Sequence, residues 1–153
     1  MFSFCIPTEF VFGSGSFKKL YQYRMPGKKA LIVTTNGGSV KRLGYLNELE
    51  KQLEKSDVSF EVFDGIEPNP ITDNIMAAAA KAKETNCDFV IGFGGGSPMD
   101  SAKLIALAAT NPGNIRDYCQ KGTGGRKQPE NTPLPVVCIS TTAQDRKLTT
   151  AVW

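Results

Sequence analysis

The chain has 153 residues, the length of one ordinary domain, and 41% of them are hydrophobic, which is enough for a packed core. Its 18 Lys and Arg against 15 Asp and Glu give a formal net charge of +3 without a basic run, which argues against a nucleic-acid partner. No apolar stretch reaches the length of a membrane span, and no signal-peptide pattern opens the chain, so we expect a cytoplasmic protein without membrane contact.

The side chains that usually carry metal and acid–base chemistry are sparse. Histidine is absent, so no imidazole of this chain can act as a general base, a proton relay or a metal ligand. The cysteines show no CxxC or CxH spacing, which disfavours structural zinc and thioredoxin-like redox chemistry. We expect them to be small buried hydrophobic residues in a reducing compartment. They are Cys5, Cys87, Cys119 and Cys138.

Two hydrophobic periods alternate along the chain. Short apolar or β-branched runs bounded by Gly, Pro and Asn predict strands, and apolar residues at helical spacing predict amphipathic helices. In chain order we expect a strand pair within 1–12, a strand at 28–34, a helix at 45–55, a strand at 60–63, a helix at 75–83, a strand at 88–93, a helix at 97–110, a polar loop over 120–132 and a strand at 134–140.

Strands that are continuously apolar and separated by helices are typical of parallel sheets covered on both faces. The order of the elements predicts an α/β fold, a doubly wound parallel sheet with right-handed crossovers. Ligands bind such sheets outside the carboxyl ends of the strands. In this chain those ends carry polar or glycine-rich segments at residues 35–39, 67–70, 94–97 and 141–142.

The segment Gly94–Ser97 lies between a buried strand and the start of a helix. Glycines let the backbone approach an anion, and a helix N-terminus offers unpaired N–H groups, so a diphosphate suits this turn. Neither G-x-G-x-x-G nor a P-loop motif occurs, and a tight strand-to-helix connection is the alternative interpretation. Asp100 could likewise cap the helix through a Ser-x-x-Asp arrangement, and Lys103 could be a solvated helix residue.

A second glycine-rich turn, Gly37-Gly38-Ser39, is followed by Lys41 and Arg42. Backbone donors, a hydroxyl and two basic groups together suit a monophosphate such as the 2′-phosphate of NADP. A surface helix start is the alternative.

The segment Gly94-Gly95-Gly96-Ser97-Pro98-Met99-Asp100-Ser101-Ala102-Lys103 resembles the GGGSxxDxAK signature of the iron-containing alcohol dehydrogenases. Three further motifs resemble the family in order and spacing, and the resemblance extends to about Ala143. They are Phe12-Gly13-Ser14-Gly15, Gly65-Ile66-Glu67-Pro68-Asn69-Pro70, and Pro133-Leu134-Pro135 leading to Ser140-Thr141-Thr142-Ala143.

The resemblance implies a two-domain, homo-oligomeric enzyme that transfers hydride between NAD(P) and a primary alcohol or aldehyde. Its N-terminal domain would be Rossmann-like, of the dehydroquinate-synthase-like type, and would bind the cofactor. A C-terminal helical domain, absent from this sequence, would hold the catalytic divalent metal, Fe or Zn, through Asp and His ligands. The Gly-Gly-Ser turn is similar to that of the butanol-dehydrogenase-like branch, which favours NADP over NAD.

Carried over by position, the resemblance implies that Gly95, Gly96 and Ser97 hold the pyrophosphate and that Asp100 lies by the nicotinamide end. It assigns no catalytic residue and no metal ligand to this chain. The full set of implied cofactor-binding residues is Gly37, Gly38, Ser39, Asn69, Pro70, Gly94, Gly95, Gly96, Ser97, Asp100, Thr141 and Thr142.

The sequence departs from the family after Ala143, where Gly-Thr-Gly-Ser-Glu would follow. We therefore expect an NAD(P)-binding domain over 1–143 and a non-family tail over 144–153, and we hypothesise that a frameshift produced this tail. Apolar surface that would face the second domain should then be exposed. Two alternatives stay open: a non-catalytic dinucleotide-binding module or inactive truncated fragment, and a glycerol-dehydrogenase-like or dehydroquinate-synthase-like enzyme.

Overall fold

A computed structural model describes residues 1, 8–36, 38–67, 72–119 and 127–141. Its centre is a parallel four-stranded sheet with the strand order β2-β1-β3-β4. The strands are β1 (Lys29–Thr35), β2 (Ser59–Ile66), β3 (Phe89–Gly94) and β4 (Val136–Ser140). The helices are η1 (Ser16–Gln22), α1 (Ser39–Arg42), α2 (Tyr45–Lys55), α3 (Thr72–Glu84), α4 (Gly96–Thr110) and η2 (Ile115–Asp117). The α/β fold with a doubly wound parallel sheet is thus confirmed.

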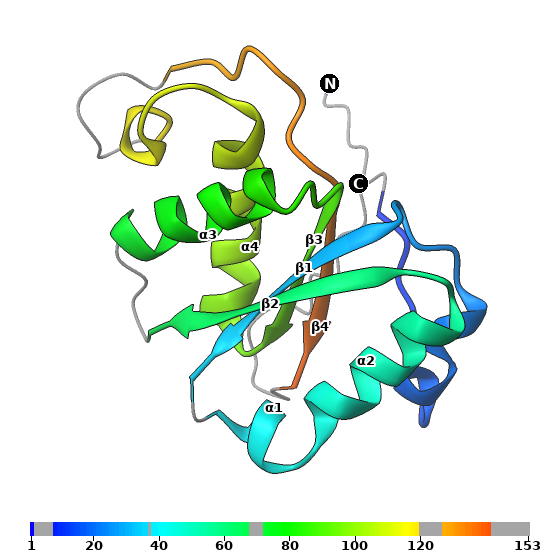
Figure 1. Cartoon of the computed structure of the whole chain (residues 1–153). Helices are drawn as coiled ribbons and strands as arrows, with labels where there is room; N and C mark the ends of the chain where they lie inside the picture. Colours follow the sequence, from blue (N-terminus) through cyan, green and yellow to red (C-terminus); the bar gives the residue numbers. More distant parts are fainter. Residues whose placement is uncertain (2–7, 37, 68–71, 120–126, 142–153) are drawn as a thin grey trace.

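The helices cover both faces of the sheet. Helices α3 and α4 lie on one face, and α1, α2 and the short η1 lie on the other (Figure 1). Alternate residues of a strand point to opposite faces, so Leu31 and Val33 enter one hydrophobic cluster while Ala30 and Ile32 enter the other. All four are fully buried, which explains why β1 reads as a continuous apolar run.

The strand order creates a switch point between β1 and β3. The chain leaves β1 toward β2 and later returns across β1 to β3, so neighbouring crossovers run in opposite directions. Register pairs Val33 with Gly92, and therefore the ends of β1 and β3 lie side by side. In open α/β sheets the crevice outside such a point is where ligands bind.

The predicted N-terminal strand pair is wrong for residues 8–12, which form no strand; residues 2–7 lie outside the described part of the chain. The weak alternation of this segment does not bury one face, since Phe10 is 52% and Phe12 is 90% exposed. The described part of the predicted loop, 127–132, contains neither helix nor strand. Within the described ranges, no helix is both long and apolar enough to cross a membrane.

Asp88, which directly precedes β3, links the start of β3 to the start of β1 by hydrogen bonds. Its carboxylate accepts hydrogen bonds from the backbone N–H of Lys28 at 2.8 and 3.0 Å and from that of Lys29 at 2.8 Å. We expect Asp88→Ala to lower the free energy of unfolding by about 1 kcal/mol, because the site is exposed and water replaces part of what is lost. Urea titration checks this, and Asp88→Asn, which keeps an acceptor oxygen, should lose less. Equal losses for the two variants would contradict the assignment.

Candidate functional site: a crevice at the carboxyl edge of the sheet

The turn from β3 into α4 requires glycine at its first position. Gly94 has a φ of +141°, a conformation that side-chain-bearing residues rarely adopt. A Cβ at this position would also lie 2.8 Å from the Cγ of Pro98. The chain therefore passes from the last residue of β3 into α4 within two residues, and the first turn of the helix lies directly beyond the strand.

The N-terminus of α4 has no side-chain cap. Its N-cap is Gly95, and among the described residues no side chain accepts a hydrogen bond there. A Cβ on Gly96 would find no atom within 4 Å, so there is open space in front of the first helical residue. First-turn N–H groups have no partner within their own helix, and they carry the positive end of its dipole. This combination of open space and unpaired donors fits an anionic group.

The structure does not support the alternative interpretation that Asp100 caps the start of α4. The helix begins at Gly96, which places Ser97 inside it and Asp100 beyond its first residues. The side chain of Asp100 is 72% exposed, and Lys103 donates to its Oδ1 at 3.4 Å. Asp100 therefore points to solvent on the outer side of the helix start, where a bound molecule could reach it.

The second glycine-rich turn lies beside the first. A Cβ on Gly38 would lie 2.4 Å from the Oγ1 of Thr35, so this turn also depends on a missing side chain. Ser39, which is exposed, opens the short helix α1. Val40 follows it, and its Cγ2 would lie 3.8 Å from a Cβ on Gly94, which brings the two turns into contact. Gly37 lies outside the described residues.

The end of β4 completes the same edge of the sheet. Ser140 is in register with Gly94, and the backbone N–H of Thr141 donates to the carbonyl oxygen of Gly94 at 2.9 Å. Thr141 is therefore held next to the turn that precedes α4. Three other implied site residues, Thr142, Asn69 and Pro70, lie outside the described part of the chain.

Sequence reasoning missed one charged residue of this region, Asp64 on β2. Lys41, which follows the second turn, donates a hydrogen bond to the Oδ2 of Asp64. This hydrogen bond lowers the pKa of the Asp64 carboxyl below its usual value, with smaller help from the nearby charges of Lys41 and Lys81. The spacing of 23 residues between the partners gives no sequence signal.

The residues described do not form a metal centre. No group of three or more His, Cys, Asp or Glu side chains gathers within the described ranges. The donor set of this part of the chain therefore does not fit a divalent metal, and no chemical step is derived through one. Cys87 and Cys119 are free thiols, and Cys87 and Cys138 are buried. Burial raises the pKa of the Cys87 thiol, which keeps it protonated and unreactive.

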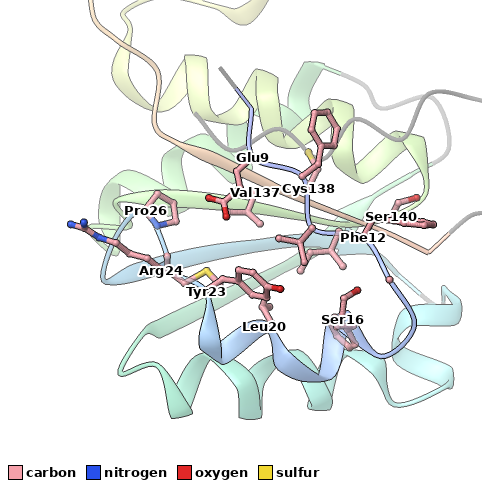
Figure 2. A pocket seen from close by; sticks show the side chains of 16 residues that line it. Glu9, Phe12, Ser16, Leu20, Tyr23, Arg24, Pro26, Val137, Cys138 and Ser140 are labelled. Carbon is pink, nitrogen blue, oxygen red and sulfur yellow. The ribbon is translucent and has the colours of Figure 1, made fainter. Parts of the chain in front are cut away.

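A separate apolar pocket lies along β4, between this strand and η1. It has a volume of about 310 Å³. Figure 2 shows its two walls, with Ser16 and Leu20 on η1 and Val137 to Ser140 on β4. Phe12 also lines the pocket, and its side chain is largely exposed. The pocket has no cluster of charged groups suited to a diphosphate.

Comparisons with known proteins agree with this architecture. The sequence profile described as "Iron-containing alcohol dehydrogenase" matches residues 7–152. The chain is 39% identical to alcohol dehydrogenase 4 of Saccharomyces cerevisiae, over 92% of this chain and 35% of the relative. It is 35% identical to the NADPH-dependent aldehyde reductase YqhD of Escherichia coli, with the same coverage of 92% and 35%.

A solved structure, the NADH-dependent butanol dehydrogenase A of Thermotoga maritima, superposes with a TM-score of 0.82 at 32% identity. It covers 92% of this chain, which in turn covers 34% of that protein. The chain thus spans about a third of the length of these relatives and corresponds to their N-terminal part. The names of two of these relatives state a nucleotide: YqhD is NADPH-dependent and the butanol dehydrogenase is NADH-dependent. From its motifs, its fold and these matches, the chain belongs to the iron-containing alcohol dehydrogenase family.

Proposed function

We propose that this chain is the dinucleotide-binding part of an NAD(P)-dependent alcohol or aldehyde oxidoreductase, and that it binds NAD(P) in the crevice at the carboxyl edge of the sheet. The observation that carries the proposal is the start of α4, which lacks a side-chain cap and has open space in front of Gly96. A pyrophosphate placed there would accept hydrogen bonds from the first-turn N–H groups.

The other residues of the edge have roles that follow from their positions. Gly95, Gly96 and Ser97 would hold the pyrophosphate by their backbone and the serine hydroxyl. Gly38 and Ser39 lie on the β1 side and would contact the adenosine half. Asp100 would border the nicotinamide half and Thr141 would line the cofactor cleft, as the resemblance implies. We extend the site to Gly37, Asn69, Pro70, Gly94 and Thr142, the remaining residues that match family positions.

When bound, the nicotinamide would supply hydride transfer to or from the carbon of an alcohol or aldehyde. This chain's own task is to bind and orient the cofactor. The iron or zinc centre of the proposed reaction would lie outside the residues described. We also propose a cytoplasmic location, which the free thiols of Cys87 and Cys119 support, and a homo-oligomeric whole protein. The domain assignment of 1–143, with the tail at 144–153, remains part of this proposal.

Titration calorimetry of the purified chain with NAD and with NADP tests the proposal. We expect Gly96→Val to weaken binding of both nucleotides at least tenfold, about 1.4 kcal/mol or more, since its side chain would occupy the space in front of α4. The folded state should be nearly as stable as that of the parent, because a Cβ at this position meets no atom.

Ala80→Val is the matched control, because it places the same side chain at an exposed helical position of α3. It should leave the affinity for both nucleotides unchanged. If the parent binds neither nucleotide, or if Gly96→Val binds as tightly as Ala80→Val, the proposed site is wrong.

A further inference from the structure

The ion pair between Lys41 and Asp64 lies beside the second glycine-rich turn and is not part of the function proposed above. Lys41 is on α1 and Asp64 is on β2, and the ammonium donates directly to the carboxylate. Both side chains keep contact with water, with exposed fractions of 33% and 48%. The hydrogen bond from Lys41 lowers the pKa of Asp64, so this carboxyl is ionised at neutral pH.

The pair is close to the crevice because α1 is close to it. Ser39, Val40 and Lys41 are consecutive, and Val40 approaches the position of a Cβ on Gly94. A dinucleotide with its pyrophosphate on α4 would direct its adenosine half toward β1 and α1, on the side where the pair lies. The ribose attached to the adenine would then be the part of the cofactor nearest to Lys41 and Asp64.

The charges at this place do not favour a second phosphate. Binding of a 2′-phosphate needs a cation that is available to it, whereas an acidic side chain accepts a hydrogen bond from a ribose 2′-hydroxyl. Lys41 is already neutralised by Asp64, and the carboxylate itself would repel a phosphate. Arg42 is the other basic residue here, and it makes no ion pair or side-chain hydrogen bond with the described residues.

We propose that Asp64 is a specificity-determining residue: by occupying Lys41 and by adding its own negative charge, it makes the site prefer NAD over NADP. This inference rests on the proposed dinucleotide site and reverses the preference for NADP that the Gly-Gly-Ser turn suggests. In the proposed arrangement, removal of the carboxylate charge frees the ammonium of Lys41 for a 2′-phosphate, and Arg42 can join it.

The experiment is titration of the parent chain and of Asp64→Asn with NAD and with NADP at low ionic strength. We expect the parent to bind NAD more tightly than NADP. In Asp64→Asn the affinity for NADP should rise about three- to tenfold, which is the effect expected from removal of one partly exposed charge. The affinity for NAD should stay equal or fall. The double variant Asp64→Asn, Lys41→Ala should lose this gain, because the freed ammonium is missing.

Glu61→Gln is the matched control. Glu61 is on the same strand and also pairs with lysines, Lys29 at 3.8 Å and Lys81 at 3.6 Å, but it contacts α3 rather than α1. It should leave the ratio of the two affinities unchanged. Binding of both nucleotides with the same ratio in Asp64→Asn as in Glu61→Gln would overturn this inference alone. Absence of any binding by the parent would overturn the proposed function and this inference with it.

Discussion

We expect Gly92→Ala to lower the free energy of unfolding by about 3 kcal/mol, because β3 and α4 touch at this residue without space for a side chain. A Cβ on Gly92 would lie 2.9 Å from the Cβ of Ala102, from the Cα of Met99 and from the carbonyl oxygen of Pro98. Two of these three atoms belong to the backbone of α4, which cannot rotate away as the end of a long side chain can. The whole helix would have to move off the strand.

The loss should appear in thermal unfolding as a fall of about 10 °C in Tm, given the usual scaling for a chain of this size. Affinity for the dinucleotide should fall as well, because displacement of α4 moves its N-terminus away from the crevice. Gly96→Ala is the matched control, since it adds the same methyl group to α4 where a Cβ meets nothing within 4 Å. It should change the stability by no more than about 0.5 kcal/mol. Equal stability of the two variants would show that the close approach at Gly92 is unimportant.

Much of the fold could be predicted because the central strands β1 and β3 are buried on both faces and therefore appear as apolar runs. The strand expected at 28–34 and the helix expected at 45–55 agree with β1 and α2 within one residue. The strand expected at 60–63 is too short, because β2 continues to Ile66. Asp64 and Gly65 interrupt its apolar run, and the pairing of Gly65 and Ile66 with Thr35 of β1 comes from the sheet rather than from local sequence.

The short helix η1 could not be predicted, because its stability comes from distant parts of the chain. The ring of Phe17 packs on that of Phe93 with 5.5 Å between their centroids, and the backbone N–H of Tyr21 donates to the Oε1 of Gln52 at 3.2 Å. Phe17, Leu20 and Tyr21 do stand at helical spacing, but the segment has only seven residues, and its N-cap, Gly15, makes no side-chain hydrogen bond. Such an element follows from tertiary contacts, which a single sequence does not reveal.

The candidate site could be located from sequence only as far as its glycine turns. A buried strand followed by Gly94–Ser97 predicted both the turn and the helix after it, and the structure confirms these local elements. A role for Asp64 could not be predicted from the sequence, because it depends on the hydrogen bond from Lys41, which belongs to another element. Charge pairs formed across a fold have no fixed spacing, unlike the turns that a short motif encodes.

We expect the second large loss of stability from substitution of Asn111, which directly follows α4. This side chain is only 2% exposed, and its Nδ2 donates to the carbonyl oxygens of Leu107 at 3.1 Å and Asn131 at 3.0 Å, with a further contact to the hydroxyl of Thr110 at 2.9 Å. Its Oδ1 accepts from the backbone N–H of Asn131 at 2.8 Å. One buried amide thus joins the end of α4 to the segment that leads into β4.

Asn111→Ala should therefore cost about 2 kcal/mol, because it removes the hydrogen bonds that this buried amide makes with part-buried backbone groups of Leu107 and Asn131 and opens a small cavity. Asn131→Ala is the control: its side chain makes a single exposed hydrogen bond, from Nδ2 to the carbonyl oxygen of Thr110 at 2.8 Å, and should cost about 1 kcal/mol or less. Urea unfolding gives both values, and hydrogen exchange should show faster exchange of the Asn131 amide in Asn111→Ala. An unchanged exchange rate would mean that the link from α4 to β4, and hence the placement of Thr141 beside Gly94, does not depend on Asn111.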